Sequence, residues 1–175
     1  MKNLRLATIN DIDAVEKLYN DITTHLENNF NYSGWENGVY PVRATAQGHL
    51  ENGLLCVYEA ENGEIAGSIA LNHLAGLGYD EASWQIPNGS NDVYLMHTLA
   101  VSPKYLHKGI GRQLLDYCAK LGKANNMLAL RLDASSENAP ALALYESCGY
   151  VHVDTRDIQY GDEILKDFWL YEKLL

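Results

Sequence analysis

Apolar residues recur at two spacings along this chain, and the change between them predicts an alternation of strands and helices. Short apolar or alternating runs, typical of strands, occupy residues 4–8, 54–59, 64–73, 95–101, 128–133, 150–159 and 164–171. Apolar positions three and four apart, typical of helices with one buried face, occupy about 12–22 and 109–125.

Start and stop signals predict two further helices. Pro41 can take the first helical position of a helix to about Glu51, and Asn52-Gly53 ends it. Another begins near Ser136 and ends at Gly149, which suits the position after a helix. The predicted order is therefore β α α β β β α β α β β.

Two long segments lack either spacing and are predicted to be loops. The first, residues 27–40, is rich in Asn, Gly and aromatic residues, and the second, residues 74–91, contains Trp84. Loops of this length in compact domains are often functional or mobile. We found no internal repeat, linker or low-complexity segment, so residues 1–175 are predicted to form a single domain.

Composition narrows the class of protein. The hydrophobic fraction of 47% is enough for one core. No run of about 18 apolar residues occurs, and the N-terminal segment lacks the apolar stretch of a signal peptide. We therefore expect a cytoplasmic protein that does not associate with membranes.

The net charge of −10 argues against a nucleic-acid partner, because phosphate contacts need a basic face. It is compatible with a cationic substrate such as an amine. Cys56, Cys118 and Cys148 sit in apolar segments with no C-x-x-C spacing, so we expect small buried hydrophobes and no metal site.

The stretch from Leu95 to Arg112 carries the first chemical signal. A strand ending before Ser102-Pro103 is followed by a Gly-x-Gly pair, Gly109 and Gly111, at the start of a helix. Such a pair brings backbone N–H groups close to a ligand at the positive end of the helix dipole, which suits a phosphate. A Walker loop is excluded because Lys108 precedes the first glycine, and a dinucleotide fingerprint fits poorly because Leu114 replaces the third glycine.

Together with Asn138, Tyr145 and Cys148-Gly149-Tyr150, this stretch resembles the GNAT superfamily of acyl-CoA N-acyltransferases. The resemblance covers residues 93–155 in detail, and the predicted element order matches the family throughout. It implies an α/β fold (α+β) with a mixed, largely antiparallel twisted sheet of about seven strands and about four helices, splayed between the fourth and fifth strands.

The resemblance also implies acetyl-CoA as cofactor and assigns residues to it. The pantetheine arm would pair with the main chain of Leu99, Ala100 and Val101, and Asn138 would lie near it or cap its helix. The pyrophosphate would be held by the loop residues His107, Lys108, Gly109, Ile110, Gly111 and Arg112. Leu106 departs from the family, whose loop usually opens with Arg or Gln.

Acetyl transfer to an amine needs a proton donor, a proton acceptor and a group that stabilises the oxyanion. By resemblance the donor is Tyr145, and a backbone N–H near Leu99 or Ala100 meets the oxyanion. His97 has a suitable pKa for the base and lies two residues before Leu99, on the same face of a regular strand. A glutamate or an ordered water is the alternative base. The amine acceptor is predicted to be lined by Trp35, Tyr40 and Trp84.

The predicted function is transfer of an acetyl group from acetyl-CoA to a primary amine by direct attack, without an acyl-enzyme. A small molecule or a peptide could supply that amine, and homodimers are common in the family. The alternatives are a non-catalytic acyl-CoA sensor or regulatory module, and an unrelated α/β binding domain with a fortuitous Gly-x-Gly.

Overall fold

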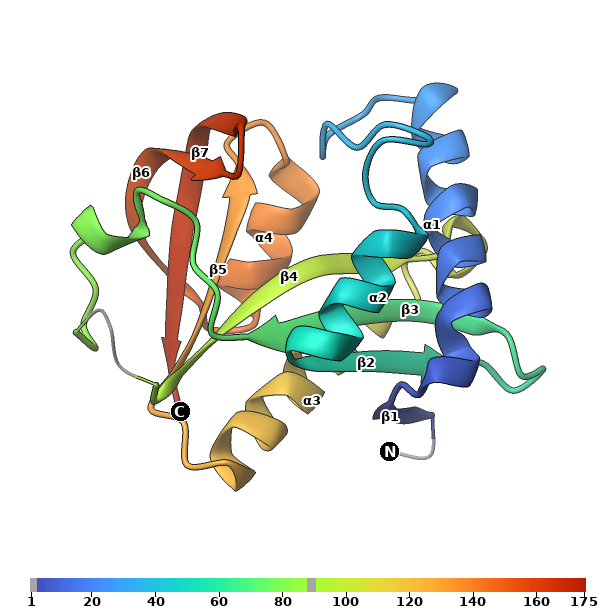
Figure 1. The fold of residues 1–175 in the computed structure, drawn as a ribbon, viewed down its shortest axis with the longest axis horizontal. Helices are drawn as coiled ribbons and strands as arrows, with labels where there is room; N and C mark the ends of the chain where they lie inside the picture. The colour runs from blue at the N-terminus through green and yellow to red at the C-terminus, as the bar shows by residue number, and fades with distance from the viewer. Residues whose placement is uncertain (1–2, 88–90) are drawn as a thin grey trace. The chain divides into compact units, whose positions relative to one another are not determined.

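The computed structural model describes residues 3–87 and 91–175, so three residues of the second predicted loop, 88–90, lie outside the described residues. The described elements are β1 (Leu4–Leu6), α1 (Ile12–Glu27), α2 (Arg43–Asn52), β2 (Leu54–Glu59), β3 (Ile65–Asn72), β4 (Val93–Val101), α3 (Ile110–Ala124), β5 (Ala129–Ser135), α4 (Ala139–Ser147), β6 (Val151–Tyr160) and β7 (Glu163–Leu174) (Figure 1). The predicted order of strands and helices is confirmed.

The seven strands pair in the order β1-β2-β3-β4-β5-β7-β6. The pairs β1/β2, β2/β3, β5/β7 and β6/β7 are antiparallel, and β4/β5 is parallel. This confirms the predicted mixed, largely antiparallel sheet. The parallel ladder is short, joining Val93–Leu95 to Ala129–Arg131, whereas β5 pairs with β7 from Ala129 to Ser135.

The chain divides into two compact units, which are described one at a time. The first unit contains the residues up to Asn72 together with His97–Cys118. The second unit contains His73–Met96 and Ala119–Leu175. Two of the three boundaries fall inside elements, one in β4 and one in α3.

In the first unit, helices cover both faces of the strands. α1 and α2 pass in front of β2 and β3 in Figure 1. The apolar face of α1 packs with Ala46 of α2 and with Leu55, Val57, Ile65 and Ala70 of the strands. All eight residues of β3 are buried, as expected for a strand with both faces covered.

The start of α2 differs from the prediction. Pro41 lies outside the helix, which begins at Arg43. Val42 is extended, with φ −129° and ψ 177°, and its N–H donates to Thr45 Oγ1 at 3.1 Å. The Thr45 hydroxyl thus accepts a hydrogen bond from the backbone just before the first turn. The prediction relied on Pro41 as the first helical residue and did not take this hydrogen bond into account.

In the second unit, a buried ion pair organises the sheet and the segment before β4. Arg131 and Glu172 on the paired strands β5 and β7 are 4% and 0% exposed, and Arg131 Nε donates to Glu172 Oε1 at 2.9 Å. The Arg131 guanidinium lies 4.2 Å from the centroid of the Trp84 ring, and Gln85 N–H donates to Glu172 Oε2 at 2.8 Å. Much of the predicted loop 74–91 is therefore packed onto the sheet.

Across residues 3–87 and 91–175, none of the helices has the length and apolar character needed to span a membrane.

The packing of α3 on β3 predicts a stability effect. A Cβ added at Gly67 would lie 2.9 Å from Ile110 Cγ2 and 3.0 Å from Leu114 Cδ1. We expect Gly67→Ala to lower the free energy of unfolding by about 1–3 kcal/mol, measured by urea denaturation. Gly48→Ala in α2 is the matched control, because its added Cβ meets nothing within 4 Å. It should stabilise the protein by roughly 0.5–1 kcal/mol, and equal effects would contradict the close packing.

Candidate active site

The loop before α3 has the backbone geometry of an anion site. His107 and Gly109 adopt left-handed conformations, with φ 61° and 74°, on either side of Lys108. Gln113 N–H donates to Gly109 O at 3.0 Å, which closes the first turn of α3. The loop is exposed at these three residues, while Ile110 is buried and anchors the helix. Its N–H groups are thus available at a helix start, where negative charge is stabilised.

Lys108 and Arg112 give this loop two cationic side chains. The Lys108 ammonium lies 4.8 Å from the centroid of the Tyr105 ring. Leu106 is 44% exposed and extended, with φ −57° and ψ 150°. Leu106, unlike an arginine or a glutamine, offers an anion no side-chain hydrogen-bond donor at this position.

β4 departs from regular strand geometry at Thr98. Its φ of 52° lies in the left-handed region, which β-branched residues rarely adopt. The expectation of a regular strand through His97 and Leu99 is therefore wrong at this residue. Exposure still alternates, because Thr98 and Ala100 are buried while His97, Leu99 and Val101 are partly exposed.

The Thr98 hydroxyl joins the first long loop and α2 to β4. Tyr40 Oη lies 2.7 Å and His49 Nε2 lies 2.9 Å from Thr98 Oγ1. The Trp35 ring packs edge-on against Tyr40, with centroids 6.1 Å apart, and also contacts the core of the first unit. Of the three predicted acceptor-lining residues, the structure thus brings Trp35 and Tyr40 together.

His97 lies in the same group of polar side chains. Its Nε2 is 2.9 Å from Asn72 Oδ1, and its ring stacks with His49 at 6.0 Å between centroids and 19° between planes. Burial, and secondly the neighbouring His97, lower the pKa of His49 to about 4. We call these five residues of the first unit the polar cluster: Tyr40, His49, Asn72, His97 and Thr98.

Tyr145 belongs to the second unit. Its side chain is 7% exposed, and its ring lies 6.2 Å from Tyr150 and 5.9 Å from Tyr171 between centroids. Burial, followed by the charge of Asp133, raises the pKa of Tyr145. The phenol therefore keeps its proton throughout the neutral range, as a proton donor must.

Asp133 is tied to two tyrosines in the second unit. The Tyr79 hydroxyl donates to Asp133 Oδ2, and the Tyr160 hydroxyl donates to the same oxygen at 3.1 Å. Removal of the carboxyl from water raises the pKa of Asp133, although both hydrogen bonds act in the opposite direction. The hydrogen bonds from these two hydroxyls partly compensate the buried carboxylate for its lost contacts with water.

Asn138 caps α4, since its Oδ1 accepts from Ala141 N–H at 3.3 Å. The helix that carries Tyr145 therefore begins at Ala139, directly after its cap, and not near Ser136. Trp84 stacks on Tyr79 at 5.5 Å between centroids, and its Nε1–H donates to Tyr79 O at 2.7 Å. Together with the Arg131 contact described above, this gives Trp84 a packing role in the second unit.

The sequence also matches a known family. The family model for the acetyltransferase (GNAT) family matches residues 14–150, well over half of the chain. The chain belongs to the GNAT acetyltransferase family. Acetyl-CoA is the acyl donor of this family.

Curated GNAT relatives match part of the chain. Streptothricin acetyltransferase of Escherichia coli is 28% identical over 87 residues, 50% of this chain and 41% of that protein. The [ribosomal protein bS18]-alanine N-acetyltransferase of Salmonella typhimurium is 32% identical over 69 residues, 39% of this chain and 47% of that protein. The chain therefore matches less than half the length of each of these relatives.

Solved GNAT structures share the fold over nearly the whole chain. The ribosomal-protein-alanine N-acetyltransferase of Brucella melitensis gives a TM-score of 0.70 at 22% identity, covering 98% of this chain and 99% of the other. The protein yncA of Salmonella typhimurium, in a structure that holds its cofactor acetyl-CoA, gives 0.67 at 20% identity, covering 98% and 92%. At these identities the likeness concerns the fold.

The predicted GNAT site residues fall in both units. The first unit contains the end of β4, the 107–112 loop, Trp35, Tyr40 and His97, and the second contains Trp84, Asn138 and Tyr145. Sequence reasoning missed His49, Asn72, Thr98 and Asp133. A signal existed for His49 alone, because it lies three residues after the buried Ala46 and so shares its helix face.

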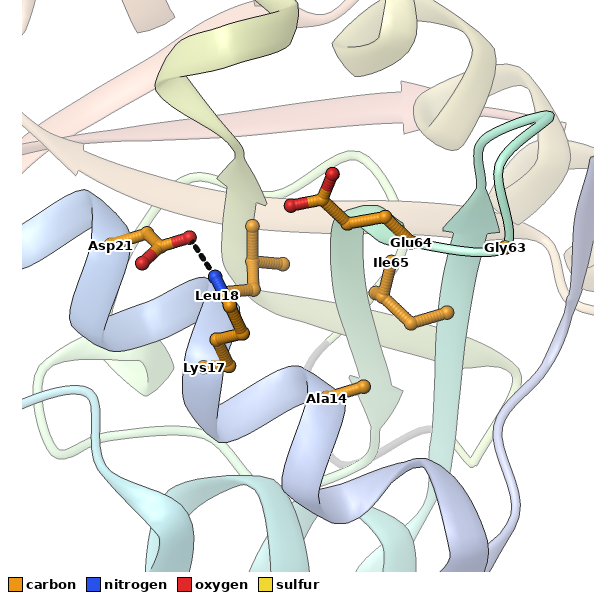
Figure 2. A pocket seen from close by; sticks show the side chains of 7 residues that line it. All are labelled: Ala14, Lys17, Leu18, Asp21, Gly63, Glu64 and Ile65. Atoms are coloured by element: carbon orange, nitrogen blue, oxygen red, sulfur yellow. Dashed lines mark hydrogen bonds and ion pairs between the residues drawn. The ribbon is translucent and has the colours of Figure 1, made fainter.

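A hollow elsewhere in the first unit contains none of these residues. It has a volume of about 160 Å³ and lies between α1 and the turn that joins β2 to β3 (Figure 2). Lys17 and Asp21 form an ion pair of 2.5 Å along its α1 side. Its lining is Ala14, Lys17, Leu18, Asp21, Gly63, Glu64 and Ile65.

The low pKa of His49 predicts a pH-dependent stability. Folded His49 takes up a proton near pH 4, whereas its ordinary pKa is 6.5, so the unfolded chain binds more protons between these values. The free energy of unfolding should therefore fall as the pH decreases through this window, by up to about 1.4 kcal/mol per pH unit from this residue.

Urea unfolding of wild type and His49→Gln between pH 4.5 and 7 checks this, and the variant should show a shallower slope. His25→Gln, on the exposed end of α1, controls for the loss of a histidine. Identical slopes for wild type and His49→Gln would contradict the burial of a neutral ring.

Proposed function

We propose that this protein transfers the acetyl group of acetyl-CoA to a primary amine by direct attack. The observation that carries the proposal is the exposed 107–112 loop at the start of α3, in a chain that belongs to the GNAT family. The loop has a left-handed residue on each side of Lys108, and left-handed residues are a component of the backbone nests that bind anions. The pyrophosphate of CoA is the anion that we assign to this loop.

The remaining cofactor contacts follow the chain along β4. The main-chain groups of Leu99, Ala100 and Val101 pair with the pantetheine arm, as an added strand would. Lys108 and Arg112 add charge to the loop, each worth about 1 kcal/mol or less at an exposed site. Asn138 caps α4 and lies near the arm.

The substrate ammonium loses two protons during the reaction. His97 accepts the first, which leaves a neutral amine whose nitrogen attacks the thioester carbon. The tetrahedral oxyanion is stabilised by a backbone N–H near Leu99, and it collapses as the C–S bond breaks. Tyr145 protonates the departing thiolate and recovers a proton from the nitrogen, which gives the amide and CoA.

Burial affects both partners of the last step. It raises the pKa of Tyr145, which by itself makes the phenol a weaker acid. A thiolate leaving into the same dry surroundings is destabilised for the same reason, so its demand for a proton rises too. Because desolvation raises the pKa of both the Tyr145 phenol and the CoA thiol, it changes the pKa difference between them less than it changes either pKa.

We assign the acceptor to the side of the first long loop. Tyr40 belongs to the polar cluster, and the Trp35 ring packs against it. Phe30, Tyr32 and Val39 of the same loop are 65%, 40% and 63% exposed. Aromatic faces suit an amine, by packing and by cation–π contact. Trp84 remains a predicted lining residue. The relatives named above are a streptothricin acetyltransferase and a [ribosomal protein bS18]-alanine N-acetyltransferase, so both a small molecule and a peptide are candidates for the source of the amine.

Thiol release from acetyl-CoA over a panel of amines tests the proposal. The panel contains aliphatic and aromatic amines, an aminoglycoside, an amino acid and a peptide that begins with alanine. Amine-dependent release by at least one member supports an enzyme. Tight CoA binding without release from any member would instead indicate an acyl-CoA sensor.

Calorimetry with CoA tests the loop itself. Gly109 has φ +74° with nothing within 4 Å of an added Cβ, so Gly109→Ala strains only the backbone. We expect CoA binding to weaken about tenfold, the equivalent of 1–2 kcal/mol of left-handed strain released by a shift of the loop. Gly63→Ala is matched in conformation, with φ +82° and the same open space, but lies in the β2–β3 turn. Equal CoA affinity of the two variants would contradict the assignment of the pyrophosphate to the 107–112 loop.

The role of Tyr145 predicts a split between kinetic constants. Tyr145→Phe keeps the ring and removes the proton, so we expect kcat to fall by about 10²-fold while KM for acetyl-CoA stays within twofold. Tyr58→Phe on β2, which removes a hydroxyl bound by Asn3, is the control. Unchanged kcat of Tyr145→Phe across the pH range would rule out Tyr145 as the acid.

A further inference from the structure

The Asn72 amide is a hydrogen-bond partner of the His97 ring, and its chemistry decides which ring nitrogen carries the hydrogen. Its Nε2 lies 2.9 Å from Asn72 Oδ1, and an amide oxygen can only accept. Nε2 must therefore carry the hydrogen, and the lone pair of the neutral ring lies on Nδ1. Asn72 is the last residue of β3 and is 6% exposed, so its amide is held in place.

We propose that Asn72 is a positioning residue that fixes the tautomer of His97, so that Nδ1 is the atom that accepts the substrate proton. The proposal deepens the proposed function, because it relies on His97 as the base. When Nδ1 gains a proton, the Nε2–H bond to Asn72 becomes charge-assisted and strengthens. The buried amide oxygen thus stabilises the imidazolium without supplying a charge of its own.

The neighbouring imidazole directs the proton to His97. His49 faces His97 from α2 with its ring stacked at 6.0 Å, and it lies against the Thr98 hydroxyl, which Tyr40 also contacts. A proton on both rings would place two like charges side by side. Burial lowers the pKa of His49 to about 4, so its ring is neutral near neutral pH, and we assign the substrate proton to His97.

The two histidines therefore have different parts. His49 stays neutral and uses Nε2 to hold Thr98, the left-handed residue that precedes Leu99. His97 takes and releases a proton at Nδ1 while Asn72 keeps Nε2 occupied. The Asn72 amide orients the His97 ring and adds no charge of its own.

Nitrogen NMR of the full chain with ¹⁵N-labelled histidine tests the tautomer without any substrate. At a pH above the titration of the ring, wild-type His97 should show the Nε2–H tautomer. Asn72→Leu, which removes the acceptor at similar volume, should give a mixture of tautomers. Asn20→Leu on the exposed face of α1 is the matched control and should leave the His97 signals unchanged. A wild-type spectrum of the Nδ1–H tautomer overturns the proposal, even if Asn72→Leu does not fold.

Kinetics then separates this proposal from the proposed function. Asn72→Asp should move the acidic limb of kcat/KM to higher pH, because a carboxylate stabilises the imidazolium, whereas Asn72→Leu should lower kcat/KM roughly tenfold, less than the 10²–10⁴-fold expected for loss of a base. An unmoved limb in Asn72→Asp overturns the positioning role. His97→Gln with full activity would remove the base and leave the measured tautomer standing, so the two failures are distinguishable.

Discussion

One strained residue holds the polar cluster of the first unit together. Thr98 adopts φ 52° in the middle of β4, a conformation that costs a β-branched residue about 1–3 kcal/mol. Tyr40 and His49 both contact its hydroxyl, so a loop and a helix share one strand residue as their polar partner. The strain persists because these two elements are fixed independently by the apolar core beneath them.

The second unit buries charged side chains, and one of them acts on Tyr145, the residue assigned as the acid. Arg131 and Glu172 neutralise each other in the sheet, while Asp133 accepts hydrogen bonds from two phenol groups. The negative potential of Asp133 is one cause of the raised pKa of Tyr145. Buried polar groups of this kind make the unit dependent on complete pairing, since one lost partner leaves an unsatisfied group.

The sequence predicted the elements better than the contacts, and the reason is physical. Spacing and capping fix local conformation, so β4, α3 and the Asn138 cap were found. The 107–112 loop together with Asn138, Tyr145 and Cys148-Gly149-Tyr150 was enough to find the family. Thr98 was missed because its left-handed backbone is imposed by distant partners and leaves no local mark. Asn72 and Asp133 lie in strands, and nothing in the local sequence identifies the distant side chains that they contact. The single-domain and site-residue predictions stay predictions.

The two compact units are not continuous segments of the chain, and this affects how the protein can be made and cut. The first unit needs residues 97–118, which follow a stretch belonging to the second. During synthesis, its core can therefore close only after residues 73–96 have already left the ribosome without their own partners. For the same reason, no single backbone cleavage can release either unit whole.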